Sequence, residues 1–296
     1  MRTCRVISLL AVVFLTAFSL SNLSAADKIL SMSTTTSTQA SGLLNILLPA
    51  FEKDTGIKVK VIAKGTGAAI RDGVDGNVDV IFVHAKSREE DFVKKGYGTK
   101  RYAVMHNDFV ILGPANDPAK VKNSSSASSA LKKIALNQST FVSRGDDSGT
   151  HTKEQFLWKQ TKLKMKTTTT TITKKGKKKS VSYSQPIGSW YNSIGQGMGK
   201  VLTYADEKQS YTMSDRGTYI KYKFGRKQKF DLTVLHEGDK ALANPYGIIP
   251  INPKTHPHVK HKLAVQFAEW LVSARGQKLI DGYRLIGKQL FYPDAI

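Results

Sequence analysis

The segment SRGDDSGTHTKE, residues 143–154, gathers several anion-binding groups into one short stretch. Arg144 provides a forked cation that matches the geometry of an oxyanion. Ser148 and Thr150 provide hydroxyl groups at the start of a helix that we predict to begin near His151. The first N–H groups of a helix have no partner within it, and the helix dipole favours negative charge there. The segment therefore predicts a site for an oxyanion with several acceptor oxygens.

Two further loops have a similar character. STTTST, residues 33–38, is a run of hydroxyl side chains, and KGTGAAIRDG, residues 64–73, is a Gly-rich turn that leads into a helix. Each could be an ordinary turn, as could 143–154 with Arg144 paired to a neighbouring Asp. Three such loops between strands and helices favour a shared site, because ligands of α/β folds bind where strands end and helices begin.

The chain alternates predicted strands and helices. Residues 78–85, VDVIFVHA, form a continuous apolar strand of the kind that is buried in a parallel sheet. A helix over 41–54 places its apolar residues at helical spacing, Gly56 suits a C-terminal cap, and Pro49 is expected to kink or split the helix. The predicted fold class is α/β: a two-lobed clamp in which each lobe is a mostly parallel sheet flanked by helices, with a ligand cleft between the lobes.

The N-terminus has the pattern of a secretory signal peptide, which we assign to residues 1–26. Basic residues precede an apolar run over 6–18, and small residues follow, with cleavage expected near Ala25 or Ala26. The run is too short for a confident membrane span. The chain's one cysteine, Cys4, precedes the run, so the mature chain is expected to have neither disulfides nor thiolate chemistry.

The remaining chain divides into two predicted lobes. Residues 27–112 and 240–296 form lobe I, residues 113–239 form lobe II, and a strand near 104–114 crosses between them. Lobe II contains a Lys/Thr-rich loop, 159–180, which is expected to be a solvated loop or an irregular edge hairpin. The net charge of +22 leaves a nucleic-acid or anionic-surface partner as an alternative, but this tract lacks the interleaved aromatics and Arg typical of nucleic-acid binding.

The chain resembles the periplasmic tungstate-binding proteins of ABC transporters, a branch of the type II extracellular solute-binding proteins, from about Ile29 to Pro293. The matching pieces are STTTSTQASGLL, KGTGAAI, DVIFVHA, NDFVILGP, SRGDDSGTHTKE, GQGM, YTMSDRGTY, NPYGIIPINP and GKQLFYP. The resemblance implies a periplasmic clamp, expected to be monomeric, that binds tungstate and delivers it to a membrane permease. It implies no enzymatic activity and no cofactor, with metal bound only as the oxyanion.

The resemblance also implies which residues contact the anion. The loops of lobe I offer hydroxyl groups from the first and mainly backbone N–H groups from the second, at Thr35, Thr36, Ser37, Thr66, Gly67 and Ala68. Lobe II offers Arg144, Ser148, Thr150 and, from the GQGM loop, Gly197. The family tends to have a hydroxyl residue just before GQGM, where this chain has Ile194, so a side-chain role at that position is in doubt.

Molybdate and phosphate remain alternative ligands. Tungstate and molybdate share shape and charge. A difference of about 1.4 kcal/mol in binding free energy would make the affinity for one tenfold higher than for the other. The pattern Arg144-x-Asp146-x-Ser148-Gly149-Thr150 also looks like the anion loop of phosphate-binding proteins, in which the Asp accepts a phosphate proton. A carboxylate that faces the ligand favours phosphate, whereas one that holds Arg144 and backbone N–H groups favours a fully deprotonated dianion.

The histidines give little support to an enzyme. His84 follows an apolar strand and is expected to be a buried structural residue, and His151 follows the anion loop without a matching nucleophile. A metal site at His256, His258 and His261 is conceivable, but no Cys or paired acid accompanies them, and a solvated helix end is the favoured interpretation.

Overall fold

The computed structural model describes residues 28–174 and 177–295, so the predicted signal peptide lies outside the described residues. Ten strands form one sheet, with the order β2-β1-β3-β11-β4-β9-β5-β8 and with β10 and β14 paired to β4. The strands β1, β2 and β3 are parallel, as are β5, β8 and β9, whereas β11 is antiparallel to its neighbours β3 and β4. The sheet is therefore mixed, with a parallel group toward each end.

The strands of this sheet are β1 (Ile29–Thr35), β2 (Lys58–Lys64), β3 (Val80–Val83), β4 (Tyr102–Gly113), β5 (Phe141–Ser143), β8 (Tyr191–Ser193), β9 (Tyr211–Asp215), β10 (Thr233–His236), β11 (Ala243–Pro250) and β14 (Tyr292–Pro293). Two small sheets pair β6 (Met165–Lys174) with β7 (Lys177–Pro186) and β12 (Arg284–Leu285) with β13 (Lys288–Gln289). The helices are α1 (Thr36–Ser41), α2 (Leu44–Thr55), α3 (Thr66–Val74), α4 (Lys86–Lys94), α5 (Ala127–Leu136), α6 (Gly149–Gln160), α7 (Met198–Glu207), α8 (Arg216–Phe224), η2 (Lys240–Leu242), α9 (His261–Val272) and α10 (Ala274–Gly282).

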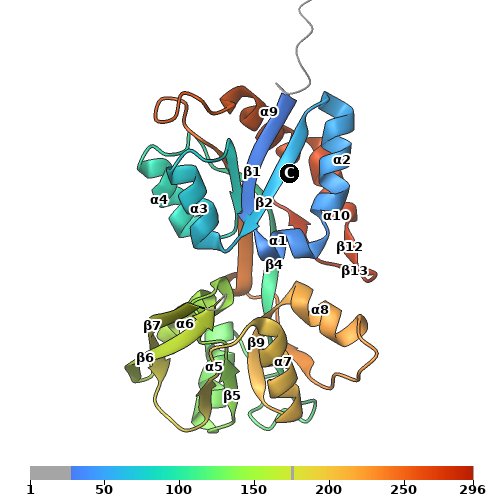
Figure 1. The fold of residues 1–296 in the computed structure, drawn as a ribbon. Coiled ribbons are helices and arrows are strands. Elements are labelled where there is room, and N and C mark those ends of the chain that lie inside the picture. The colour runs from blue at the N-terminus through green and yellow to red at the C-terminus, as the bar shows by residue number, and fades with distance from the viewer. Residues whose placement is uncertain (1–27, 175–176, 296) are drawn as a thin grey trace, which may run out of the picture.

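The molecule has two halves, one above the other in Figure 1. The upper half contains β1, β2, α1 to α4, α9 and α10, and the lower half contains α5 to α8 with β5 to β7 and β9. The long strand β4 extends into both halves and is paired with β11 from Ala243–Asp108 to Ile248–Tyr102. The register of this ladder shifts between Tyr246 and Gly247, which is the mark of a β-bulge. The predicted crossing near 104–114 coincides with β4.

The first hydroxyl run and the following helix differ from the prediction. The run is a tight strand-to-helix junction instead of a longer loop: β1 extends to Thr35 and α1 starts at the next residue, with Thr35 as its N-cap. We call this junction the first anion loop. The single helix predicted over 41–54 is divided, but not at Pro49, which lies inside α2. The division falls at Gly42, whose φ of 90° ends α1 in a left-handed conformation that glycine adopts readily. Gly56 caps α2 as predicted, with its N–H bonded to Glu52 O.

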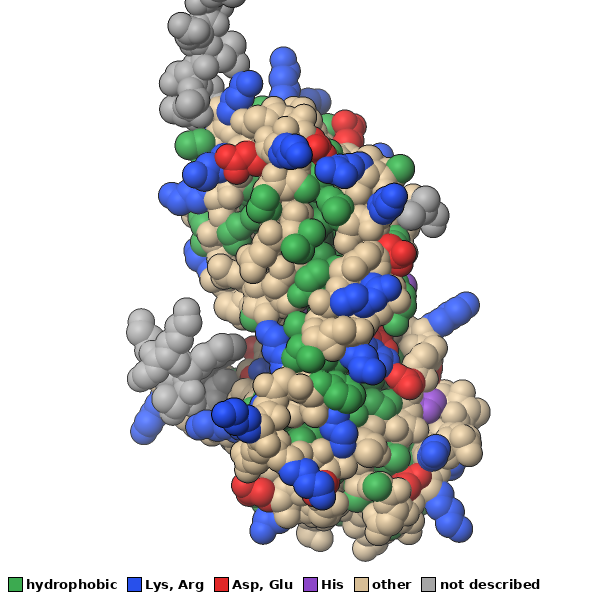
Figure 2. All heavy atoms as spheres, turned by 90° about the vertical axis from the view of Figure 1, so that its right-hand side faces the viewer, with side chains coloured by type: hydrophobic (Ala, Val, Ile, Leu, Met, Phe, Trp, Pro, Cys, Tyr) green, Lys and Arg blue, Asp and Glu red, His purple; other side chains and the backbone are tan. Residues whose placement is uncertain are grey.

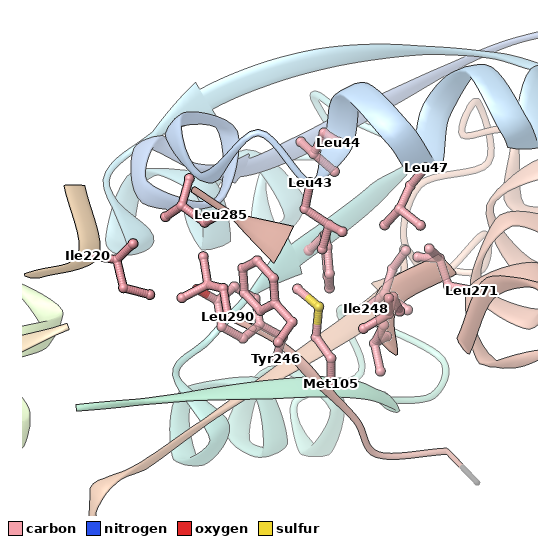
Figure 3. Packing of buried hydrophobic residues seen from close by; sticks show 14 of the residues in the cluster. Leu43, Leu44, Leu47, Met105, Ile220, Tyr246, Ile248, Leu271, Leu285 and Leu290 are labelled. Atoms are coloured by element: carbon pink, nitrogen blue, oxygen red, sulfur yellow. The ribbon is translucent and has the colours of Figure 1, made fainter. Parts of the chain in front are cut away.

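A large hydrophobic cluster holds the helices against the sheet. Leu44, Leu47 and Phe51 form the buried face of α2. Figure 3 shows these leucines above Met105 of β4 and Tyr246 and Ile248 of β11, with Leu271 beside them. A second cluster lies in the lower half and is built around Trp158, which is fully buried against the rings of Phe141, Trp190 and Tyr191. The strands that carry the predicted site are thus fixed by apolar packing in both halves.

The Lys/Thr-rich tract forms a regular antiparallel hairpin, β6–β7, beside α6 in Figure 1. Val181 and Gln185 are buried on one face, while Thr167, Thr169 and Ser182 of the other face are exposed. The tract is therefore a hairpin, as one of the two interpretations had it, but that interpretation is wrong in calling it an irregular edge hairpin: its pairing is regular and its two strands form a sheet of their own.

Figure 2 shows Lys and Arg side chains scattered over both halves of the face it displays, without a continuous basic stripe. Among the described residues, no helix combines the length and apolar character that crossing a membrane requires.

Candidate oxyanion-binding site

In the upper half, parallel pairing brings the first two predicted anion loops together. Thr35 at the end of β1 pairs with Lys64 at the end of β2, and Thr34 pairs with Phe82 of β3. The segments that follow these strands therefore leave the sheet at one edge. They contain Thr35–Ser37, Gly65–Ala68 and His84, and all reach the side of the sheet where ligands of α/β folds bind.

Thr35 is at the centre of a hydroxyl network in the first loop. It is only 3% exposed, and its Oγ1 accepts the N–H of Thr38 at 3.1 Å as the N-cap of α1. The same oxygen lies 3.0 Å from Ser37 Oγ, and His84 Nε2 lies 3.1 Å and 3.2 Å from the Thr35 and Ser37 oxygens. Thr36 and Ser37 are exposed. The loop therefore holds ordered hydroxyl groups at the edge of the sheet.

In the lower half, the Arg144 loop follows β5, and the GQGM loop follows its parallel neighbour β8. Ser143 pairs with Ser193, and the N–H of Gln196 donates to Arg144 O at 3.1 Å. Gly197 is the N-cap of α7 and has an extended backbone. Ile194 is half-buried, and its backbone N–H donates to Ser143 O. At this position a backbone hydrogen bond, and no side-chain hydroxyl group, joins the two loops.

The helix after the Arg144 loop starts earlier than predicted. The structure begins α6 at Gly149, so the predicted start near His151 is wrong by two residues. Ser148 is the N-cap, and its side chain accepts the N–H of His151 at 3.3 Å. Thr150 lies inside the first turn, where it is buried. The leading N–H groups of this turn have no carbonyl partner within the helix, as expected for an anion-binding helix start.

Asp146 lies between Arg144 and the backbone of the loop. Its Oδ2 accepts from Arg144 Nη2 at 2.6 Å, and its Oδ1 accepts the N–H of Ser148 at 3.2 Å. Burial alone would raise the pKa of Asp146, but the charge of Arg144 and the hydrogen bonds from Ser148 and Arg144 lower it overall. The carboxylate is thus ionised near neutral pH, and both of its oxygens already have donors. Arg144 Nη1 also lies 3.5 Å from Thr150 Oγ1, and its Nε is buried without a partner among the described residues.

Gly145 is required by the close approach of the neighbouring loop. Its φ of 56° is left-handed, and a Cβ added there would lie 1.9 Å from Ser193 Oγ and 3.3 Å from Tyr183 Oη. The hydroxyl group of Tyr183, on β7 of the hairpin, donates to Ser193 Oγ at 2.5 Å. Its ring also meets the ring of His151 edge-on at 4.6 Å. The Lys/Thr-rich hairpin therefore packs against the Arg144 loop and helps to fix its position.

The two sets of loops meet at Gly149 and His84. A Cβ added to Gly149 would lie 3.8 Å from His84 Cε1, which is ordinary van der Waals distance. The first turn of α6 in the lower half therefore faces the end of β3 in the upper half. Sequence reasoning treated His84 as a structural residue; the structure places it between the halves, among the predicted site residues.

The second loop of the upper half has a cation that the sequence analysis missed. A Cβ on Gly67 would lie 3.1 Å from Arg88 Nη2, so the guanidinium group of this α4 residue lies beside the space that a side chain at Gly67 would fill. The helical pattern of SREEDF gave no signal for such a contact. Thr66 and Ala68 lie in the first turn of α3 on this loop. Among the described contacts, only Thr150 of the predicted ligand-binding residues lies within reach of the Arg144 side chain. The roles of Arg144, Thr150 and all the other predicted residues in binding the anion stay predictions.

A buried carboxyl group supports the Arg144 loop from below. Glu154 of α6 accepts from Ser143 Oγ at 2.7 Å, from Tyr191 Oη at 2.6 Å and from Trp158 Nε1 at 3.1 Å. It is 2% exposed, so it is an internal acceptor of hydrogen bonds. Burial raises the pKa of Glu154 to about 7, although these three hydrogen bonds oppose the shift.

The raised pKa of Glu154 makes stability depend on pH. Between the ordinary value of 4.5 and about 7, the folded protein binds more protons at this site than the unfolded chain. The free energy of unfolding is therefore expected to fall as pH rises through this window, by at most about 3 kcal/mol from Glu154. Urea denaturation of wild type and Glu154→Gln from pH 4.5 to 8 measures this, and the variant should lose that part of the pH dependence. Identical pH dependence in the two proteins would show that Glu154 ionises normally.

The C-terminal histidines do not form a metal site in the described part of the chain. A ring nitrogen of each of His256, His258 and His261 lies within 2.9 Å of a backbone carbonyl, at Val74, Gly76 and Ile251 respectively. No cluster of three or more metal-ligating side chains occurs among residues 28–174 and 177–295. His256 and His258 tie the turn before α9 to the end of α3, and His261 ties the start of α9 to the residue after β11.

Comparisons with known proteins identify the family to which this fold belongs. The model of the family described as "PBP superfamily domain" matches residues 24–275. The tungstate-binding protein TupA of Peptoclostridium acidaminophilum is 44% identical over 268 residues, which cover 89% of this chain and 85% of that protein.

Two solved structures extend the similarity to three dimensions. The tungstate-binding protein TupA from Desulfovibrio alaskensis G20 is 44% identical, with a TM-score of 0.78, over 90% of this chain and 99% of that chain. The structure described as the tungstate ABC transporter from Geobacter sulfurreducens is 47% identical, with a TM-score of 0.69, over 87% of this chain and 99% of that chain.

Proposed function

The chain belongs to the PBP superfamily and, within it, to the family of the TupA tungstate-binding proteins, and from this premise we propose that it binds tungstate for an ABC transporter. In this function it is a two-lobed clamp that closes on one dianion and delivers it to a membrane permease. Tungstate is the transported ligand, no cofactor takes part, and no chemical step follows binding.

The engagement of Asp146 is the observation that carries this choice of ligand. Its carboxylate is held by Arg144 Nη2 at 2.6 Å and by the N–H of Ser148 at 3.2 Å. A deprotonated dianion offers only acceptors, so it is suited to a site whose remaining groups donate. Hydrogen phosphate would need an acceptor for its proton, and this carboxylate is already engaged. The arrangement favours tungstate or molybdate over phosphate.

The proposed ligand contacts come from both halves. Arg144 supplies the charged donor, while the first turns of α3 and α6 and the N-terminus of α7 supply backbone N–H groups. The hydroxyl groups of Thr35 and Ser37 complete the set from the upper half. A Cβ added to Gly149 in the lower half would lie 3.8 Å from His84 Cε1 in the upper half. This closeness supports a closed arrangement in which donors of both halves reach one anion.

The proposal also includes the cellular setting. Residues 1–26 act as a signal peptide, the mature protein is a periplasmic monomer, and residues 113–239 form the second lobe between the two segments of the first. The strongly positive net charge of the chain attracts anions over distance, which supports rapid capture of a scarce ligand.

Calorimetric titration of the signal-less protein tests the proposal. Tungstate, molybdate, sulfate and phosphate are added in separate runs in a phosphate-free buffer. We expect tight one-to-one binding of tungstate and no heat from sulfate or phosphate. Competition between molybdate and tungstate then gives the selectivity directly.

Other outcomes would redirect the assignment. Phosphate binding without tungstate binding would mean that Asp146 turns to the ligand and accepts its proton. If none of the four anions binds, the proposal is refuted. The alternative is then a nucleic acid or an anionic surface that binds the basic surface of the protein in a salt-dependent way.

A further inference from the structure

The imidazole of His84 connects segments that are far apart in the sequence. Its Nε2 lies 3.1 Å from Thr35 Oγ1 and 3.2 Å from Ser37 Oγ in the first anion loop. Its Nδ1 lies 3.2 Å from Asn244 Oδ1 on β11, and Asn244 Nδ2 donates to Asn107 Oδ1 on β4 at 2.7 Å. His84 thus joins the anion loop to the two paired strands, β4 and β11.

These contacts define the tautomer of His84. The amide group of Asn244 is used as a donor to Asn107, so its oxygen faces Nδ1, and Nδ1 must carry the proton. Burial lowers the pKa of His84, which favours the neutral ring. The lone pair on Nε2 then accepts a hydroxyl proton from Thr35 or Ser37. In the empty protein, that proton is directed at the ring and is withheld from an anion.

A dianion changes this arrangement. It attracts a proton to the nearby ring, because an opposite charge stabilises the charged form. With Nε2 protonated, the ring donates to the oxygen of Thr35 or Ser37, and the released hydroxyl proton can point to the ligand. One protonation therefore adds a positive charge and a free donor to the site.

We propose that His84 is a positioning residue of the anion site, which takes up a proton when the dianion binds and turns the hydroxyl group of Thr35 or Ser37 toward it. This inference rests on the proposed tungstate function. His84 thus raises the affinity for the anion indirectly, because the hydroxyl group that it turns donates to an oxygen of the anion. By linkage, tungstate affinity rises as pH falls.

Other ionisable groups occur on the elements around His84. Tyr246 of β11 packs against the ring at 4.7 Å, and Glu89 and Arg88 belong to α4, which follows His84 directly. Asp215 at the end of β9 raises the pKa of His84, but by less than burial lowers it. The ionisable groups ahead of and within α6 are the Arg144–Asp146 pair, Asp147, His151, Lys153, Glu154 and Lys159. Burial lowers the pKa of His151, whose Nδ1 accepts the N–H of Asp147, and raises the pKa of Glu154 to about 7. These two groups are the main competitors for the proton.

Calorimetry in buffers of different ionisation enthalpy tests the proposal with tungstate between about pH 6 and 8. Wild type is expected to take up close to one proton per tungstate near pH 7, and its affinity should rise by nearly tenfold per unit decrease in pH. His84→Gln should bind with little proton uptake and a flat pH profile. His258→Gln is the matched control, since His258 is exposed and bonded to Gly76 O.

Each result separates the alternatives. Tungstate binding without proton uptake in wild type overturns the role of His84 but leaves the proposed function intact. Uptake that persists in His84→Gln also overturns it and points to His151 or Glu154. Absence of tungstate binding by wild type refutes the proposed function and this inference with it. If His84→Gln does not fold, imidazole NMR signals of wild type, followed against pH with and without tungstate, decide whether His84 is the group that titrates.

Discussion

Arg144→Ala is expected to weaken tungstate binding by about 3–5 kcal/mol, which is a factor of roughly one hundred to several thousand. The guanidinium group can give a dianion two charge-assisted hydrogen bonds, each worth about 1.5–3 kcal/mol. Its removal also leaves the Asp146 carboxylate, now without its cation, close to the ligand. Repulsion between the two negative groups adds to the loss. Calorimetric titration, or competition where binding is very tight, measures the change.

Two further variants identify the source of the Arg144 effect. Arg144→Lys keeps the charge but not the forked geometry, so an intermediate loss is expected. Asp146→Asn in the alanine background removes the unpaired carboxylate and should recover part of the affinity. A thermal melt of each variant checks that the fold is intact. An Arg144→Ala protein that binds tungstate within threefold of wild type would remove this residue from the site.

Gly145→Ala is expected to cost about 3 kcal/mol or more of tungstate affinity, without any change in the charged groups of the site. The added methyl group would lie 1.9 Å from Ser193 Oγ, so the Arg144 loop must move away from the loop after β8. The left-handed φ of 56° adds about 1–2 kcal/mol of strain for an L residue. Both effects displace Arg144 and the first turn of α6, whose positions determine the donor geometry.

Gly96→Ala is the matched control for Gly145→Ala. Gly96 also has a left-handed φ, 79°, but no atom lies within 4 Å of an added Cβ. It follows α4 and is not among the predicted site residues. The control should lose stability through strain and keep its tungstate affinity. Equal affinity losses in the two variants would indicate a general effect of the fold and would contradict a specific role for the contact with Ser193.

Local patterns in the sequence were sufficient for much of the fold. The apolar run that contains β3 predicted a buried strand, and Val80–Val83 are buried throughout. The spacing of Leu44, Leu47 and Phe51 predicted α2, and Gly56 marked its end. The break at Gly42 was missed because apolar residues continue across it, and only its φ of 90° shows that the chain turns there. The antiparallel strand β11 was missed because its pairing with β4 depends on residues more than a hundred positions away.

The candidate site was predictable to a different degree in its two parts. The Arg144 loop carries its cation, hydroxyl groups and glycines within a few residues, so its chemistry can be read locally. His84 has no such signal, since its partners Thr35 and Asn244 lie 49 and 160 positions away. Tyr183 was also hidden, because the low complexity of the tract gave no indication that one of its rings contacts His151 and Ser193.

The two strands that join the halves also concern how many empty molecules are ready to bind. The bulge at Tyr246 and Gly247 lies inside the upper half, where Gly247 also pairs with Val83 of β3, so the ribbon between the halves is the part of β4 and β11 beyond it, as far as the pair Asp108–Ala243. Bending of this two-stranded ribbon need not break its backbone pairs, and we expect open and closed conformers to differ little in free energy. The apparent Kd exceeds the intrinsic Kd only by the reciprocal of the competent fraction. Scavenging of an anion at trace concentration would then owe as much to the pairing of two strands as to the donors around the ligand.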